Sequence, residues 1–188
     1  MDNREILLDK ALLLFSQRGY DAVGVQEIVD AVGVTKPTMY HYFESKRGLL
    51  DALIHREEGR ILKRLWREST YEGDLVLSLE RIVSTYFKLS QEQKDFYRLQ
   101  MAMVFAPPES ESNQAIKPYI NQQIRILENI FIQAAAGHGN LIGKHKQYAS
   151  GLLGLINAMI GLYLNNELAL TDQLVYQLVH QFMYGIFS

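Results

Sequence analysis

The amino-acid sequence predicts an all-α protein, with a small N-terminal helical domain followed by a larger helical bundle. Apolar residues recur at helical spacing through nearly the whole chain. No long segment alternates with a period of two, as a half-buried strand would. Breaks at Gly and Pro separate the periodic segments. The 188 residues are 48% hydrophobic and 21% charged, which is the composition of a globular chain long enough to bury a core.

Three short helices are expected in the first 45 residues. The first carries an apolar stripe at i, i+4, i+7 and i+8 and ends at Gly19, a C-cap residue. The second repeats this pattern over residues 25–32 before Gly33 interrupts it. The third begins at Thr35, whose hydroxyl can accept a hydrogen bond from a free N–H group, and has Pro37 in its first turn. We expect its inward face to be formed by Met39, Tyr42 and Phe43.

Six further helices are expected after Ser45, which can cap the first of them. Polar or Gly-containing breaks and the Pro107-Pro108 pair separate them, because a proline pair cannot continue a helix. Thr171 is the expected cap of the last one. The expected helices cover about 46–69, 75–90, 96–105, 113–136, 144–166 and 171–187. We place the domain boundary so that residues 1–46 form the first domain and residues 47–188 the second.

Composition argues against a secreted or membrane protein. The absence of cysteine excludes a disulfide framework and thiolate metal sites. The first ten residues, MDNREILLDK, mix charges of both signs and lack the apolar core of a signal peptide. The most apolar stretch, residues 149–164, is shorter than the roughly 20 residues that span a bilayer, so we interpret it as a buried helix. We therefore expect a cytoplasmic protein that does not associate with membranes.

No pattern in the chain indicates an enzyme. The nucleophile elbow, the P-loop and the dinucleotide-binding glycine pattern are all missing. His138 and His145 bracket a loop with no acidic or cysteine ligand near them in the sequence, so we expect no metal site. We predict no catalytic residue and no cofactor.

The segment from Gln26 to Leu50 is the most informative part of the chain. It combines two short helices and a tight Gly-containing turn, as in a helix-turn-helix whose second helix lies in the major groove of DNA. Lys side chains can donate to guanine, Thr methyl groups can contact thymine, and Tyr hydroxyls can bind phosphate. The third helix presents such groups away from its inward face. The face opposite the inward one carries Pro37, Tyr40, His41 and Glu44, and Lys36 and Thr38 flank it near the N-terminal end of the helix.

Net charge does not support this interpretation by itself. The chain has a formal charge of −2, and its first 47 residues hold six Lys and Arg against seven Asp and Glu. A DNA-binding prediction therefore depends on where the charges lie. Lys46 is well placed, because it begins the next helix, where free N–H groups also favour a phosphate.

The pattern G-Y-x-x-V-x-V-x-x-I-x-x-x-x-G-V-T-K-P-T-M-Y-H-Y-F-x-S-K, from Gly19 to Lys46, resembles the DNA-binding motif of the tetracycline-repressor (TetR) family. The resemblance implies that double-stranded DNA is the partner. Base edges would be contacted by Lys36, Pro37 and Thr38, and phosphates by Tyr40, His41 and Lys46. Two positions depart from the family pattern. Gly24 stands where a capping Ser or Thr usually contacts phosphate, and Val32 replaces the usual Ala before the turn glycine.

The resemblance further implies that the bundle from about residue 47 onward binds a ligand and forms a dimer. The bundle is rich in large flexible side chains, which suit a small apolar or aromatic molecule. Filling the core is the alternative role for each of them. The predicted ligand contacts are Trp66, Tyr86, Phe96, Tyr97, Met101, Phe105 and Tyr119.

The last two helices are predicted to form a homodimer interface. The first of them is apolar nearly all round, with a second stripe of small residues beside its large ones, and such a helix needs partners on several sides. Ordinary packing within one chain is the alternative. The predicted interface residues are Leu152, Leu155, Ile156, Met159, Tyr163, Val175, Leu178 and Phe182.

Three functions remain open at the level of sequence. The first is a transcriptional regulator, with repression from a palindromic operator and release by an apolar ligand. The second is a DNA-binding protein with a non-transcriptional role, such as chromosome organisation. The third is a small-molecule-binding protein whose helix-turn-helix no longer binds DNA.

Overall fold

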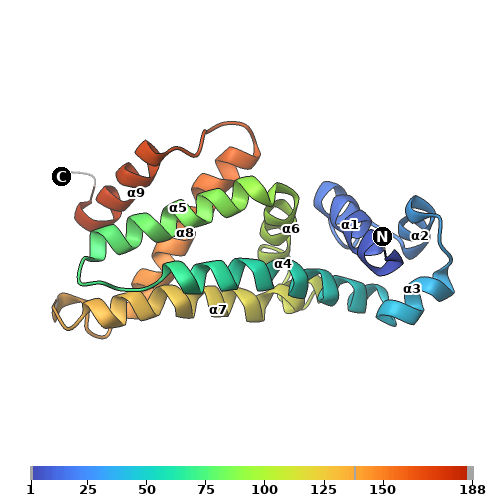
Figure 1. Cartoon of the computed structure of the whole chain (residues 1–188), viewed down its shortest axis with the longest axis horizontal. Helices are drawn as coiled ribbons and strands as arrows, with labels where there is room; N and C mark the ends of the chain where they lie inside the picture. Colours follow the sequence, from blue (N-terminus) through green and yellow to red (C-terminus); the bar gives the residue numbers. More distant parts are fainter. Residues whose placement is uncertain (1, 138, 186–188) are drawn as a thin grey trace. The chain divides into compact units, whose positions relative to one another are not determined.

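A computed structural model describes residues 2–137 and 139–185, and over these ranges the chain is helical without strands (Figure 1). This confirms the predicted all-α class. A 3-10 turn, Gly139–Leu141, precedes α8. The helices of the described residues are α1 (Asn3–Arg18), α2 (Val25–Val32), α3 (Lys36–Phe43), α4 (Lys46–Glu68), α5 (Leu75–Glu92), α6 (Lys94–Val104), α7 (Glu111–Ala134), α8 (His145–Leu164) and α9 (Asp172–Tyr184).

The helices group into two compact units. Met1–Arg60 and Gln93–Pro118 form the first, here called the head unit, and Ile61–Glu92 and Tyr119–Ser188 form the second, the bundle unit. The head unit thus includes the first half of α4 and all of α6 as well as the three N-terminal helices, because α1 packs against α6. The assignment of residues 1–46 as a DNA-binding domain is a functional division and stays a prediction.

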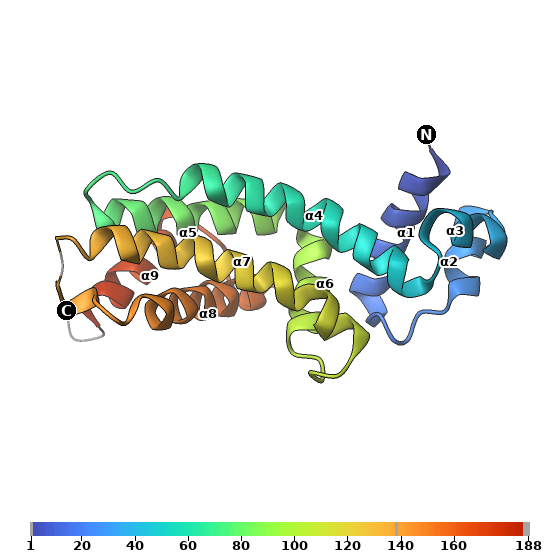
Figure 2. The same ribbon diagram turned by 90° about the horizontal axis from the view of Figure 1, so that it is seen from below.

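The head unit has its core around α1. This helix packs against α2, α3 and α6 (Figures 1 and 2). Apolar side chains from all these helices and from the start of α4 are fully or almost fully buried, which removes them from water and stabilises the unit. They include Leu7, Leu8, Phe15, Ile28, Val29, Met39, Phe43, Leu49, Leu53 and Phe96.

Tyr42 does not lie where the sequence pattern placed it. Its side chain is 36% exposed, whereas Met39 and Phe43 are buried, so the prediction of an inward Tyr42 was wrong. Residues 39 and 43 are four apart and share one face of a helix, while residue 42 points about 100° away from residue 43. The Tyr42 ring instead lies beside those of its neighbours, with ring centroids 5.6 Å from His41 and 6.1 Å from Phe43.

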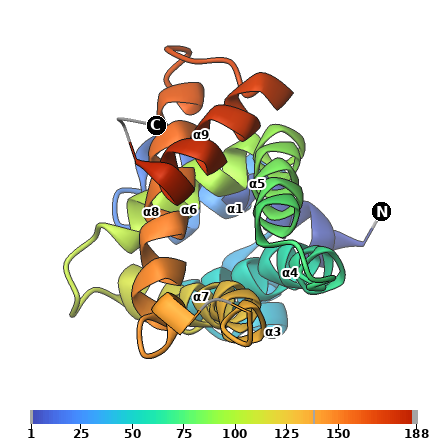
Figure 3. The same cartoon turned by 90° about the vertical axis from the view of Figure 1, so that its left-hand side faces the viewer.

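The bundle unit is built on α5, which packs against α8 and α9 (Figure 3). The ring of Phe131 on α7 lies 5.9 Å from that of Tyr148 on α8 and 6.1 Å from that of Phe182 on α9. The hydroxyl of the buried Tyr86 donates to Gln123 Oε1 at 3.2 Å. This hydrogen bond satisfies two polar groups in an otherwise apolar interior.

The predicted helix caps are confirmed. Gly19 ends α1 with a φ of 81°, and the side chains of Thr35 and Thr171 accept hydrogen bonds at the starts of α3 and α9. Gly24 precedes α2 without a side-chain cap, as its lack of a side chain requires. Most helix ends lie within one or two residues of those expected. The last helix was expected to reach Phe187, which lies outside the described residues.

The α8 helix is long and apolar enough to cross a membrane by length and composition alone, with a mean hydropathy of 1.2. Core helices of water-soluble proteins pass the same test. About 33% of this window is buried, so α8 leaves much apolar surface uncovered within one chain.

Candidate nucleic-acid interface

The turn between α2 and α3 is fixed by local backbone geometry. Gly33 adopts a left-handed conformation with a φ of 76°, which glycine does at little cost. The next amide, that of Val34, donates to the carbonyl oxygen of Val29 at 3.0 Å. The hydroxyl oxygen of Thr35 then accepts from the amide of Thr38 at 3.4 Å. These contacts set where α3 begins.

The outer face of α3 carries the predicted DNA contacts. Buried Met39 and Phe43 anchor the helix, and Lys36, Pro37, Tyr40 and His41 are exposed around it. The hydroxyl of the half-buried Thr38 lies 2.9 Å from that of Thr35, so its methyl group is the part left for an outside contact. The structure therefore brings five of the six predicted DNA contacts together on one short helix.

Lys46, the sixth, lies at the start of α4 in a different environment. Its ammonium nitrogen is 4.1 Å from the centroid of the Tyr20 ring, within the range of a cation–π contact. Burial lowers the pKa of Lys46, while the charges of Asp21 and Glu111 act in the opposite direction. Lys46 is thus a half-buried cation held against an aromatic face.

Tyr20 was not among the predicted site residues, although it belongs to the G-Y pair of the matched motif. Its side chain is 5% exposed, and its hydroxyl donates to Glu111 Oε2 at 2.6 Å. Burial, and then the hydrogen bond to Glu111, raise the pKa of Tyr20 far above its usual range. Glu111 is 91 residues away in the sequence, so local sequence patterns could not have paired them.

The corner between α3 and α4 requires glycine at position 48. A Cβ atom added to Gly48 would overlap the carbonyl oxygen of Phe43. Ser45 caps the new helix, since its hydroxyl oxygen accepts from the Gly48 amide at 2.9 Å. The chain therefore leaves α3 and enters α4 through a close backbone approach, which fixes Lys46 relative to α3.

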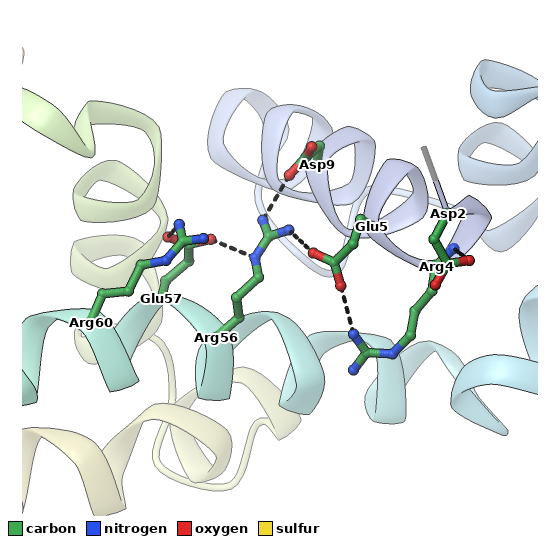
Figure 4. Close-up of polar contacts among 7 residues, drawn as sticks. All are labelled: Asp2, Arg4, Glu5, Asp9, Arg56, Glu57 and Arg60. Atoms are coloured by element: carbon green, nitrogen blue, oxygen red, sulfur yellow. Dashed lines mark hydrogen bonds and ion pairs between the residues drawn. The ribbon is translucent and has the colours of Figure 1, made fainter.

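An ionic network centred on Arg56 joins α1 to α4 (Figure 4). Its guanidinium nitrogens lie 3.0 Å from Glu5, 2.8 Å from Asp9 and 2.7 Å from Glu57. Arg60 also contacts Glu57, at 3.2 Å. Burial lowers the pKa of Arg56, but the carboxylates, beginning with Glu5, outweigh this effect and raise it. The network holds α1, and with it the packing of α2 and α3, against the first half of α4.

The predicted ligand contacts occupy different environments. Tyr86, Phe96 and Tyr97 are buried, and Met101 and Tyr119 are half-buried. Trp66 is 62% exposed and Phe105 is 83% exposed, so neither contributes to an interior. Phe105 follows the last residue of α6, where the chain turns into the Pro107-Pro108 loop.

Trp66 instead lines a surface groove of about 430 Å³ in the bundle unit. The other residues of the groove come from α7, and most are polar. They are Gln122, Arg125, Ile126, Glu128, Asn129 and Ile132.

The predicted dimer residues also divide by burial. Leu152, Ile156, Val175 and Leu178 are buried within the chain's own core. A second, partly exposed apolar face remains on α8 and α9. It contains the other four predicted residues and the small-residue stripe beside them, namely Gly151, Gly154, Leu155, Ala158, Met159, Tyr163 and Phe182.

Comparison with known proteins finds a family match within the head unit. Residues 7–53 match the model of "Bacterial regulatory proteins, tetR family". The matched segment contains all of α2 and α3, most of α1 and the start of α4, and therefore every predicted DNA contact. Residues 7–53 of the chain therefore carry the DNA-binding segment typical of the tetR family.

Curated relatives of this chain are named as HTH-type transcriptional regulators. The chain is 24% identical over 189 residues to the HTH-type transcriptional activator FasR of Mycolicibacterium smegmatis, covering 98% of this chain and 82% of FasR. It is 43% identical over 54 residues to the HTH-type transcriptional repressor ComR of Escherichia coli, covering 29% of this chain and 26% of ComR. Two other relatives are matched over only 54% and 37% of their own length.

Solved structures of transcriptional regulators share the fold over nearly the whole chain. The crystal structure of the transcriptional regulator FadR from Bacillus subtilis in complex with stearoyl-CoA has a TM-score of 0.80 at 19% identity. The match covers 97% of this chain and 98% of that one. The likeness therefore extends to the helices of the bundle unit, whose sequence lies outside the family model.

Proposed function

We propose that this regulator is a cytoplasmic, homodimeric repressor that binds a palindromic operator and is released by an apolar small molecule. The observation that carries the proposal is the exposed face of α3. Capped by Thr35 and anchored by Met39 and Phe43, this short helix presents cationic, hydroxyl and imidazole groups to solvent. A packing helix does not need such a face, whereas a recognition helix does.

The proposed contacts divide into two classes. Lys36, Pro37 and Thr38 lie in the first turn of α3, the end of a recognition helix that reaches base edges, and they would select the sequence. Tyr40, His41 and Lys46 would contact phosphates and contribute affinity without selecting a sequence.

The partly exposed face of α8 and α9 supports the homodimer. Small residues on α8, among them Gly151, Gly154 and Ala158, allow a second helix to approach closely. A two-fold dimer would use the same face of both copies. Its two recognition helices would need to lie roughly 34–36 Å apart to enter successive major grooves.

Two observations support an apolar ligand near α6. The FadR protein of similar fold was solved with stearoyl-CoA, which carries a long acyl chain. In this chain, α6 combines buried Phe96 and Tyr97 with Gln100, whose buried Oε1 accepts no hydrogen bond within the described part of the structure. An unsatisfied buried acceptor costs about 1–3 kcal/mol, so a mainly apolar ligand with one hydrogen-bond donor near its head would suit this helix.

Selection of bound DNA from a random library tests the proposal. A palindromic motif, bound by a species of twice the chain mass, is the expected result. Recovery of no enriched sequence would refute sequence-specific regulation and favour a non-transcriptional role. A reporter placed behind the selected motif then distinguishes repression from activation.

Acyl-CoA thioesters and free fatty acids of graded chain length are the first ligands to test. They should raise the melting temperature of the regulator and release the selected DNA. Stabilisation that leaves the affinity for DNA unchanged would refute the proposed coupling.

A further inference from the structure

The side chain of Tyr20 lies between two opposite charges within the head unit. The ammonium of Lys46 lies over its ring, 4.1 Å from the centroid. The carboxylate of Glu111 accepts a hydrogen bond of 2.6 Å from its hydroxyl. Tyr20 is itself held by an edge-to-face contact with Phe15, at 5.3 Å between centroids. The cation and the anion are therefore both positioned by one buried phenol.

Glu111 belongs to a part of the chain that is tied to α6. It is the first residue of α7 and follows the Pro107-Pro108 loop (Figure 2). Two residues later, the side-chain amide of Asn113 donates to the carbonyl oxygens of Met103 and Val104, both at 3.1 Å. A displacement at the end of α6 would therefore carry Glu111 with it.

Space for such a displacement exists beside Tyr20. A surface hollow of about 220 Å³ lies beside Tyr20. Its lining includes Gly19, Tyr20 and Ala22 from the end of α1 and the loop after it, and Leu99 and Met103 from α6. Well-packed interiors resist shifts of their helices, so an unfilled volume at this position permits one.

We propose that Glu111 competes with DNA phosphate for Lys46, and that Tyr20 holds Glu111 in the competing position. The proposal rests on the proposed function, in which Lys46 contacts phosphate. Because Glu111 lies at the junction between α6 and α7, the affinity for DNA would depend on the position of this junction. Glu111 thereby acts against binding, and movement of this junction alters how much Lys46 attracts a phosphate.

The charges around Lys46 are consistent with this competition. Both Asp21 and Glu111 favour the charged form of Lys46, against the burial that lowers its pKa. Asp21 follows Tyr20 directly in the chain and stays with it. Of these two carboxylates, only Glu111 can move with α6. A displacement of α6 can therefore reach Lys46 through Glu111.

The experiment compares Glu111→Gln with Glu109→Gln, which removes the same charge from an exposed site in the adjoining loop. Glutamine at 111 still accepts a hydrogen bond from Tyr20, so the fold should be kept, which thermal melting checks. Binding to a random duplex of about 24 base pairs at about 50 mM salt reports phosphate contacts alone. Glu111→Gln should tighten binding roughly 2–5-fold, the range expected when one charge–charge interaction near the surface is removed, and Glu109→Gln should change it less.

The same two substitutions are then made with Lys46→Met, whose apolar chain can still cover the ring of Tyr20. The advantage of Glu111→Gln over Glu109→Gln should disappear in this background. NMR titration of Lys46 gives a readout without DNA, in which Glu111→Gln should lower the pKa of Lys46 and Glu109→Gln should not.

The outcomes separate the two proposals. If Lys46→Met leaves DNA affinity and its salt dependence unchanged, the phosphate contact of Lys46 is wrong, and the competition is refuted with it. If Lys46→Met weakens binding but Glu111→Gln behaves like Glu109→Gln, the competition alone is refuted. If the intact chain binds no duplex under these conditions, the proposed function itself is overturned.

Discussion

Replacing Arg56 by Met should destabilise the head unit strongly, because Arg56 neutralises a buried carboxylate. Methionine keeps most of the apolar stem but removes the charge that neutralises Glu57, whose side chain is only 4% exposed. Arg60 would remain as a partner at 3.2 Å. Because removing one member of a buried ion pair costs about 3–5 kcal/mol, and Arg60 still neutralises part of the charge, we expect a loss near 3 kcal/mol.

The contacts of Arg56 with Glu5 and Asp9 add little to this figure. Asp9 is largely exposed and Glu5 is partly exposed, and an ion pair of this kind near the surface contributes about 0–1 kcal/mol. The magnitude therefore comes from leaving Glu57 without its nearer cation. A second variant that also converts Glu57 to Gln should recover most of the loss, since position 57 would no longer carry an unpaired buried charge.

Urea denaturation followed by far-ultraviolet circular dichroism measures the effect. Arg60→Met is the matched control, because Arg60 contacts the same carboxylate from an exposed position and should cost less than about 1 kcal/mol. Equal free energies of unfolding for Arg56→Met and Arg60→Met would contradict the argument from burial. So would an Arg56→Met protein that regains no stability when Glu57→Gln is added.

Three further predictions concern DNA, assembly and pH. Lys36→Ala or Thr38→Ala should change the free-energy difference between preferred and other DNA sequences by roughly 1–3 kcal/mol. Tyr40→Ala should instead weaken binding to all sequences, which competition assays measure. Identical sequence preferences in all three variants would contradict this division of roles. Leu155→Glu, on the partly exposed face of α8, should convert the dimer to monomer or aggregate in sedimentation, and a parent that is monomeric at micromolar concentration would refute the dimer. Because the pKa of Tyr20 is raised in the folded state, its contribution to stability is complete below the unfolded value of about 10 and is lost as pH rises above it. Tyr20→Phe should therefore be less stable at neutral pH but lose less stability than the parent between about pH 9 and 11, and parallel pH curves would count against this.

Local signals in the sequence predicted the helices well. Thr35, Thr171 and Gly19 act on their own neighbouring backbone, so a short window contains all the information needed to place them. The exposed face of α3 followed in the same way, because helical periodicity decides which residues oppose Met39 and Phe43. The prediction of an inward Tyr42 was wrong because the inward face of this eight-residue helix is too narrow for two consecutive aromatic side chains.

Features that depend on distant residues were not predictable. Nothing near Tyr20 indicates that Glu111 accepts its hydrogen bond, and nothing near Trp66 indicates that its helix turns it to the surface. On α8 the sequence is apolar on both faces, so periodicity could not decide which stripe enters the core. The structure places Leu152 and Ile156 inside, and this moves the proposed interface to the neighbouring face with Leu155.

In this helix-turn-helix, the residues that recognise the DNA sequence are separate from the tight corner at Gly48 that orients α3. The outward side chains of α3 touch little else in the chain, so they can be exchanged to suit another operator. The corner accepts not even a methyl group, since a Cβ atom at position 48 would displace the carbonyl oxygen of Phe43. New DNA specificities can therefore arise from the surface of α3 while the angle at which it is presented stays constant, and a library randomised at Lys36, Thr38 and His41 with Gly48 retained should remain rich in folded regulators.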